Sequence, residues 1–135
     1  MKAIIFAAGL GTRLQPFTLQ HPKALVEVGG KPMLQRVIER LRDAGIKRIV
    51  VNVHHFAPQI VDFINRNDGF GCDIAISDES SLLLDTGGGI AKAAELLDGD
   101  EPFMAYNADI LSDFDISKMI EAHRLSGADV TPVSY

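Results

Sequence analysis

Two glycines, a threonine and an arginine follow an apolar run at the N-terminus, in the order Gly9-Leu10-Gly11-Thr12-Arg13. Glycine permits positive φ, so consecutive backbone amides can point at one spot and bind an anion. The guanidinium of Arg13 is planar and can donate to two phosphate oxygens at once. The segment therefore predicts a phosphate-binding turn, although the glycines alone would also suit a tight turn at the exit of a strand.

The segment differs from two common glycine-rich phosphate loops. A dinucleotide fingerprint needs a small residue where Leu14 stands and an acidic residue closing the second strand, where Asn52 and Val53 stand. A Walker loop needs Gly-Lys-Ser or Gly-Lys-Thr after four intervening residues, and that sequence is absent. A redox protein that uses a dinucleotide is therefore disfavoured.

A second cation, Lys23, directly follows Pro22 in a loop that also contains Pro16 and is too polar for a core. Proline fixes its own φ and biases the preceding residue towards extended backbone, so Lys23 is delivered at a defined place. Lys23 is thus a candidate phosphate ligand. A solvated loop lysine is the alternative, and by itself Lys23 would favour that alternative.

An acidic residue and a glycine-rich stretch complete the set of candidates. Asp109 follows an apolar segment, and a nucleotide-bound Mg²⁺ typically takes one or two protein carboxylates, the other ligands being phosphate oxygens and water. A turn or cap aspartate fits the spacing of Asp109 equally well. The stretch 84–90 carries three glycines, whose bare backbone could pair with a flat base or could simply enter a helix. The pair His54-His55 lacks further metal ligands at suitable spacing, so we interpret it as loop packing or nucleotide contact.

Apolar runs alternate with helical patterns along the whole chain, which predicts elements that could position these residues. The predicted strands are 2–8, 46–53, 73–77, 102–106 and 129–133, and the predicted helices begin near Pro32, Pro58, Gly89 and Asp115. This alternation predicts an α/β fold, a Rossmann-like three-layer α/β/α arrangement with a mainly parallel sheet. Ligands bind beyond the carboxyl ends of such strands, so the segments after Ala8, Val53, Ser77 and Tyr106 are expected to form the site.

Composition limits the class of protein. The chain has 135 residues, the size of one ordinary domain, and 47% apolar with 23% charged residues excludes a disordered chain. Thirteen basic and eighteen acidic residues leave a net charge of −5, which disfavours nucleic acid and anionic membrane as partners. The single cysteine, Cys72, suits a reducing compartment and is expected to pack as a small hydrophobe. No apolar run approaches the length of a membrane span.

The apolar N-terminus could imitate a short secretory signal, but it is barely long enough and continues straight into the glycine segment. We therefore interpret it as a buried first strand of a cytoplasmic protein.

Together these residues resemble the signature of the sugar-phosphate nucleotidyltransferases. That pattern is glycine-x-glycine-threonine-arginine, then proline, a proline-lysine pair, and a lysine-proline pair that opens a helix. Its counterparts in this chain are Gly9–Arg13, Pro16, Pro22-Lys23 and Lys31-Pro32. The resemblance implies transfer of a nucleotidyl group from a nucleoside triphosphate to a sugar 1-phosphate, with Mg²⁺ as cofactor and pyrophosphate as the second product.

The resemblance also implies a role for each candidate. Arg13 would contact the β and γ phosphates, Lys23 the reacting α phosphate, and Asp109 the metal, which makes these three the expected catalytic residues. Many members have glycine before this aspartate, whereas Ala108 leaves less room beside the metal. The expected nucleotide-binding residues are Ala8, Gly9, Gly11, Thr12, Arg13, Thr86, Gly87, Gly88 and Asn107.

The stretch Leu84–Ile90 is most similar to that of uridylyltransferases acting on N-acetylmuramate 1-phosphate, so UTP is favoured and a role in sugar-nucleotide supply for the cell wall is implied. Guanylyl or thymidylyl transfer is one alternative, and a non-catalytic nucleotide-binding or regulatory module is another. Family enzymes are longer, so residues 1–135 are expected to be the nucleotide-binding part of one domain, without its C-terminal sugar-binding part.

Overall fold

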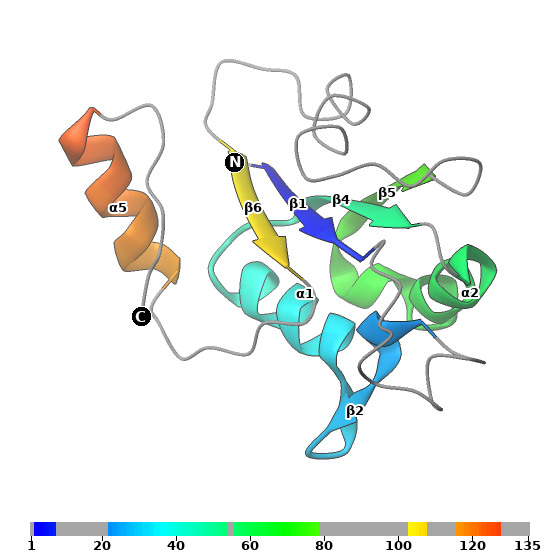
Figure 1. Ribbon diagram of the computed structural model, residues 1–135. Coiled ribbons are helices and arrows are strands. Elements are labelled where there is room, and N and C mark those ends of the chain that lie inside the picture. Colours follow the sequence, from blue (N-terminus) through cyan, green and yellow to red (C-terminus); the bar gives the residue numbers. More distant parts are fainter. Residues whose placement is uncertain (1, 8–21, 54–55, 79–102, 108–115, 128–135) are drawn as a thin grey trace.

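A computed structural model describes residues 2–7, 22–53, 56–78, 103–107 and 116–127 (Figure 1). Its main sheet contains β1 (Lys2–Phe6), β4 (Arg48–Val53), β5 (Asp73–Asp78) and β6 (Phe103–Asn107), in the order β5-β4-β1-β6. All three strand pairings are parallel. This sheet and its helices confirm the predicted α/β fold.

Among the described residues, three α-helices contribute to the core with this sheet: α1 (Met33–Asp43), α2 (Ala57–Arg66) and α5 (Ile116–Ser126). The apolar stripes of α1 and α2 contribute to one core together with alternate residues of β1 and β4. Ile116 of α5 joins the same core. The buried residues on α1 are Met33, Leu34, Val37, Ile38 and Leu41, which follow the helical period seen in the sequence.

The two faces of β1 are both buried, as its continuous apolar run predicts. Ala3 and Ile5 belong to the main core, whereas Ile4, which is 0% exposed, forms a second cluster with Val50 and Phe6. The predicted helix that begins at Gly89 and the predicted strand 129–133 lie outside the described residues. A helical layer over the second cluster therefore stays a prediction.

The observed strand and helix limits differ slightly from the predicted ones. β1 ends at Phe6 rather than Ala8, and β4 begins at Arg48 rather than Ile46. Ile46 is used instead to close α1, because its N–H donates to the Leu41 carbonyl (2.9 Å) and the N–H of Gly45, at φ +90°, donates to the Arg42 carbonyl (2.9 Å). These two bonds form the capping motif that glycine favours at helix ends.

A short hairpin before α1 is absent from the predicted elements. It pairs β2 (Glu27–Val28) with β3 (Lys31–Pro32), and Pro32 is the N-cap of α1 rather than part of its first turn. Gly29 and Gly30 have φ of +61° and +85°, as a two-residue turn with both central residues at positive φ requires. A glycine pair between residues that suit strands was the available signal.

Two 3₁₀ turns complete the described elements, η3 (Lys23–Leu25) before the hairpin and η4 (Asp68–Gly71) after α2. Within the described ranges, no helix is both long and apolar enough to span a membrane.

Candidate functional site

The strand order reverses direction between β1 and β6. The chain proceeds from β1 outwards to β4 and β5, and then returns to place β6 on the other side of β1. In open parallel sheets, ligands bind at such a reversal, beyond the carboxyl ends of the strands. The carboxyl ends of β1 and β6 are therefore the expected floor of a ligand site.

The last residues of these two strands, Phe6 and Asn107, are register partners. Along the chain, Ala7 leads into the glycine segment that begins at Gly9, and Asn107 lies two residues before Asp109. Parallel neighbours in a sheet lie about 4.8 Å apart. The segments predicted to bind phosphate and magnesium thus leave the sheet from adjacent strands.

One row of residues crosses the four described strands at this end. Ser77, Asn52, Phe6 and Asn107 are linked by successive register pairs, and we call them the carboxyl-end row. Cross-strand partners share a face of the sheet. Asn52 and Ser77 are 3% and 4% exposed, whereas Asn107 is exposed and can contact a ligand. Its predicted contact to nucleotide stays a prediction.

Lys23 opens η3, whose backbone is held against the first turn of α1. Ala24 is buried in the main core, and the N–H of Met33 donates to the Val26 carbonyl (2.9 Å). Since α1 ends just before β4 begins, its first turn and η3 lie towards the carboxyl ends of the strands (Figure 1). Lys23 is half-buried there, at the same edge of the sheet as Asn107.

Asn52 has a contact that the sequence did not predict. Its side-chain Oδ1 accepts a hydrogen bond of 2.6 Å from the N–H of Ala7, where β1 has ended. The available signal was a polar residue in a strand that is otherwise apolar from Ile49 onwards. Asn52 therefore belongs to the surroundings of the site.

The other predicted site residues lie outside the described residues, and their roles stay predictions. They are Ala8, Gly9, Gly11, Thr12, Arg13, Thr86, Gly87, Gly88 and Asp109, together with the histidine pair at 54–55. Where the structure describes the chain, no three His, Cys, Asp or Glu side chains gather into a possible metal site. The predicted magnesium would depend on Asp109.

Cys72 packs partly buried against the main core, as predicted. Burial raises the pKa of its thiol, and the nearby positive charges of Arg42 and Lys47 oppose that rise. Cys72 precedes the first residue of β5, so it lies at the amino end of the sheet, opposite Asn107. Its place at the opposite end of the sheet keeps it away from the candidate site.

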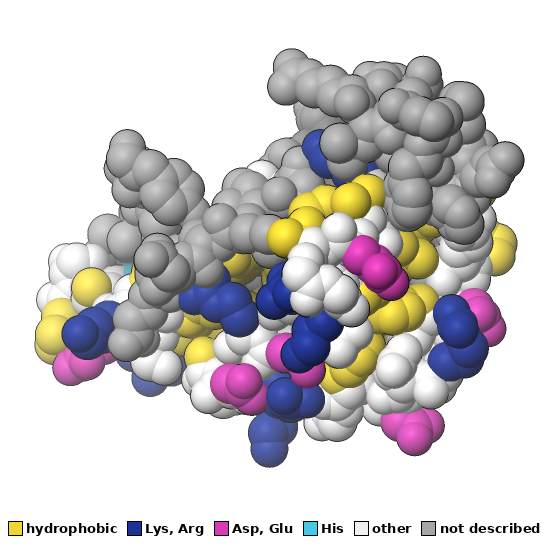
Figure 2. Space-filling model, turned by 90° about the horizontal axis from the view of Figure 1, so that it is seen from below, with side chains coloured by type: hydrophobic (Ala, Val, Ile, Leu, Met, Phe, Trp, Pro, Cys, Tyr) yellow, Lys and Arg dark blue, Asp and Glu magenta, His cyan; other side chains and the backbone are white. Residues whose placement is uncertain are grey.

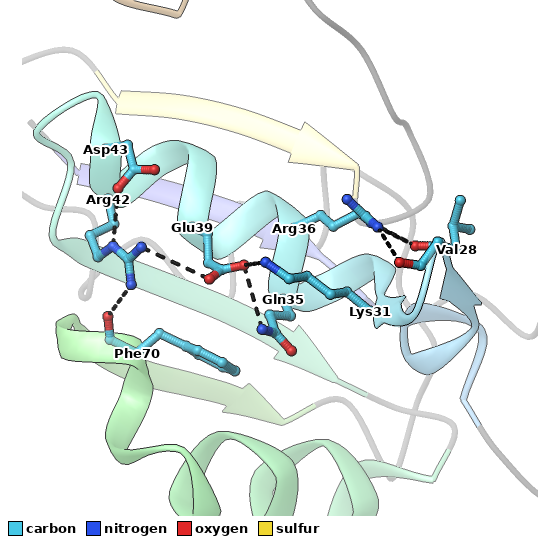
Figure 3. A network of polar contacts seen from close by, with 9 residues as sticks. Val28, Lys31, Gln35, Arg36, Glu39, Arg42, Asp43 and Phe70 are labelled. Atoms are coloured by element: carbon cyan, nitrogen blue, oxygen red, sulfur yellow. Dashed lines mark hydrogen bonds and ion pairs between the residues drawn. The ribbon is translucent and has the colours of Figure 1, made fainter.

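Figure 3 shows a network of polar contacts along the outer side of α1. Glu39 pairs with Lys31 (3.1 Å) and Arg42 (3.9 Å), and Arg42 also donates to the Phe70 carbonyl (3.1 Å). Arg36 donates from Nε to the Val28 carbonyl (2.8 Å) and from Nη2 to the Gly29 carbonyl (3.1 Å). These cations hold β3, the hairpin turn and η4 to α1, which is a structural role.

Comparison with known proteins identifies the family of this chain. Residues 2–135 match the family described as nucleotidyl transferase. The N-acetylmuramate alpha-1-phosphate uridylyltransferase of Neisseria meningitidis serogroup B is 43% identical over 117 residues, covering 87% of this chain and 50% of that protein. A probable mannose-1-phosphate guanylyltransferase of Oryza sativa subsp. japonica is 36% identical over 134 residues, covering 97% of this chain and 37% of that protein.

A solved structure has the same fold. HddC from Yersinia pseudotuberculosis, complexed with GMP-PN, superposes with a TM-score of 0.79 at 32% identity, covering 90% of this chain and 53% of that chain. The present chain thus spans half or less of the length of the two curated relatives. The family match over nearly the whole chain, with a sheet whose order reverses between β1 and β6, shows that the chain belongs to the nucleotidyl transferase family, in its sugar-phosphate branch.

Proposed function

We propose that the full-length protein transfers a nucleotidyl group from a nucleoside triphosphate to a sugar 1-phosphate and releases pyrophosphate. The observation that carries this proposal is the pairing of Phe6 with Asn107, because it makes neighbours of the strands that lead to Gly9 and Asp109. The family and the names of the relatives support the same reaction class.

The proposed reaction is a direct in-line displacement. A phosphate oxygen of the sugar 1-phosphate attacks the α phosphorus of the triphosphate and forms the new P–O bond. The bond from the α phosphorus to the oxygen bridging the β phosphate breaks, and its electron pair leaves with pyrophosphate. The nucleophile is already an anion, so no serine, cysteine or histidine needs to be activated.

Catalysis then depends on bringing two polyanions together and stabilising charge at the α phosphorus. In the proposal, Arg13 holds the β and γ phosphates, and Lys23 faces the α phosphate. Magnesium, with Asp109 as protein ligand, would supply further neutralisation of phosphate charge. Backbone amides of Gly9–Arg13 would orient the triphosphate.

UTP is the favoured donor. The support is the resemblance of Leu84–Ile90 to uridylyltransferases, together with the 43% identity to the Neisseria meningitidis protein. GTP is the second candidate, because the rice guanylyltransferase is similar over 97% of the chain. We further propose that residues 1–135 bind the nucleotide, that the sugar is bound by further chain, and that the enzyme works in the cytoplasm in sugar-nucleotide synthesis for the cell wall.

The test uses the purified full-length protein with UTP, GTP, CTP or dTTP, each with N-acetylmuramate 1-phosphate or mannose 1-phosphate, with and without Mg²⁺. We expect magnesium-dependent pyrophosphate release, fastest with UTP. Thermal stabilisation by a triphosphate without pyrophosphate release would support the non-catalytic alternative instead. Thermal stabilisation by NADH and by none of the triphosphates would overturn the proposed nucleotidyl transfer.

The isolated 135-residue chain provides a second test. We expect it to bind nucleotide weakly and to turn over little or no substrate, because the sugar contacts would be absent. Robust uridylyl transfer by this chain alone would contradict the proposed division of the domain.

A further inference from the structure

Asn52 is a buried polar side chain in a strand that is otherwise apolar from its second residue. β4 reads Arg-Ile-Val-Val-Asn-Val, and every residue from Ile49 to Val53 is buried. Asn52 itself is 3% exposed. Burying a side-chain amide costs free energy unless the amide is hydrogen-bonded. An asparagine side chain at this buried place therefore needs a hydrogen-bond partner.

The partner is the N–H of Ala7, which donates to two oxygens of the same residue. It lies 2.6 Å from Asn52 Oδ1 and 3.2 Å from the Asn52 backbone carbonyl. The backbone contact alone would continue the parallel ladder by one residue. The side-chain contact is shorter and adds a second acceptor at the point where β1 has ended.

Ala7 is the last described residue before the predicted triphosphate-binding segment, Ala8–Arg13. It is 5% exposed, so its backbone leaves the sheet from a buried position. We propose that Asn52 is a positioning residue, whose side-chain oxygen fixes the Ala7 amide and thereby the direction in which the triphosphate-binding segment leaves β1. This inference rests on the proposed function.

The chemistry of asparagine fits this role better than that of its nearest substitutes. Leucine has a similar volume but no acceptor for the Ala7 N–H. Aspartate keeps an acceptor but would bring negative charge next to a segment that binds a polyphosphate. Asparagine supplies a neutral acceptor at the required place.

The test compares Asn52→Leu and Asn52→Asp in the full-length protein, with initial rates measured against each substrate in turn. A displacement of about 1 Å can cost up to about 100-fold in rate, so we expect Asn52→Leu to lower kcat/KM for the triphosphate about 10- to 100-fold. The KM for sugar 1-phosphate should not change. Asn52→Asp should keep kcat near that of the parent at saturating triphosphate, while its KM for triphosphate rises through charge repulsion.

Ser77→Ala is the matched control. Ser77 is equally buried and is the register partner of Asn52, but it lies on β5, on the side away from β1. It should leave both substrate parameters unchanged. If Asn52→Leu does not fold, the folded Asn52→Asp variant still tests the inference. An unchanged KM for triphosphate in Asn52→Asp would overturn it.

A purely structural role gives a different result. It would lower kcat with both substrates by the same factor, in proportion to the folded fraction, and would leave both KM values unchanged. Failure of the proposed function is seen in the unsubstituted protein, which would release no pyrophosphate with any triphosphate. If the parent protein is active and Asn52→Leu has the same kinetic parameters as the parent, the inference about Asn52 is wrong, while the proposed function still holds.

Discussion

Two regions of this molecule differ in how many polar side chains they contain and in how deeply those side chains are buried. The outer side of α1 carries many charged groups, and Lys and Arg side chains lie among Asp and Glu on the face shown in Figure 2. The carboxyl-end row has few polar groups, yet Asn52 and Ser77 in it are almost completely buried.

Exposure to water explains why loss of a contact in the carboxyl-end row is expected to cost more stability than loss of an ion pair on α1. Exposed ion pairs are screened by water and typically contribute 0–1 kcal/mol, approximately, to stability. A polar group buried in the sheet has no water to replace a lost partner, so breaking its contact costs more. We therefore expect the charged groups on α1 to give structural support, and the buried contact of Asn52 to matter more for the proposed site.

The largest expected effect tests the functional side of this comparison. Arg13→Ala and Asp109→Ala should each slow turnover of the full-length protein about 10²- to 10³-fold, as removal of other electrostatic catalytic groups does. Glu39→Gln, on the outer side of α1, is the control and should keep the parent rate. Steady-state pyrophosphate release is the measurement. A near-parental rate for either alanine variant would remove that residue from the mechanism.

The next effect compares two adjacent residues of α1, one in the main core and one in the outer network. Ile38 is 0% exposed in the main core, whereas Glu39 takes part in the outer network. Ile38→Ala should lower the free energy of unfolding by about 2–5 kcal/mol through lost burial and a cavity. Glu39→Ala should lower it by about 1 kcal/mol or less. Urea unfolding measures both, and equal losses would contradict the ranking of the two faces.

A smaller effect distinguishes the two glycines of the hairpin turn. Alanine at either position meets the left-handed backbone penalty of about 1–2 kcal/mol. A Cβ at Gly29 would also lie 2.7 Å from Arg36 Nη2, whereas a Cβ at Gly30 would meet nothing within 4 Å. Gly29→Ala should therefore destabilise the protein more than Gly30→Ala.

The two losses should become equal when Arg36→Ala is combined with each glycine variant, because the crowded guanidinium is then absent. Thermal or urea unfolding of the four variants checks this. A difference that persists without the Arg36 side chain would show that the contact with Arg36 is not its cause.

The smallest effect concerns the exposed ion pair between Lys31 and Glu39. The Lys31 side chain is 49% exposed, so Lys31→Ala should cost about 0.2–1 kcal/mol at low salt. At 1 M salt the screening length falls to about 3 Å and the difference from the parent should vanish. Unfolding in low and high salt measures it, and a loss that does not depend on salt would contradict an electrostatic origin.

Much of the described secondary structure could be predicted from local signals. The apolar run at Lys2–Phe6 and the 3.6-residue period of α1 predict their elements directly. The exact start of β4 could not be predicted, because Ile46 suits a strand as well as the capping motif that uses it. For the candidate site, the sequence predicts roles for Lys23 and Asn107, and these stay predictions; it gave no role to Asn52, whose partner is 45 residues away.

By itself, the sequence determined most of the described strands and helices, though not the β2–β3 hairpin. It also determined which residue types could handle phosphate, because hydrophobic period, glycine and proline act locally along the chain. Only the tertiary structure decided that β6 lies beside β1, and so that the exits towards Gly9 and Asp109 are neighbours. It also decided that the Asn52 side chain holds the Ala7 amide. Such lateral contacts follow from how distant segments pack around a common core, and no local pattern specifies them.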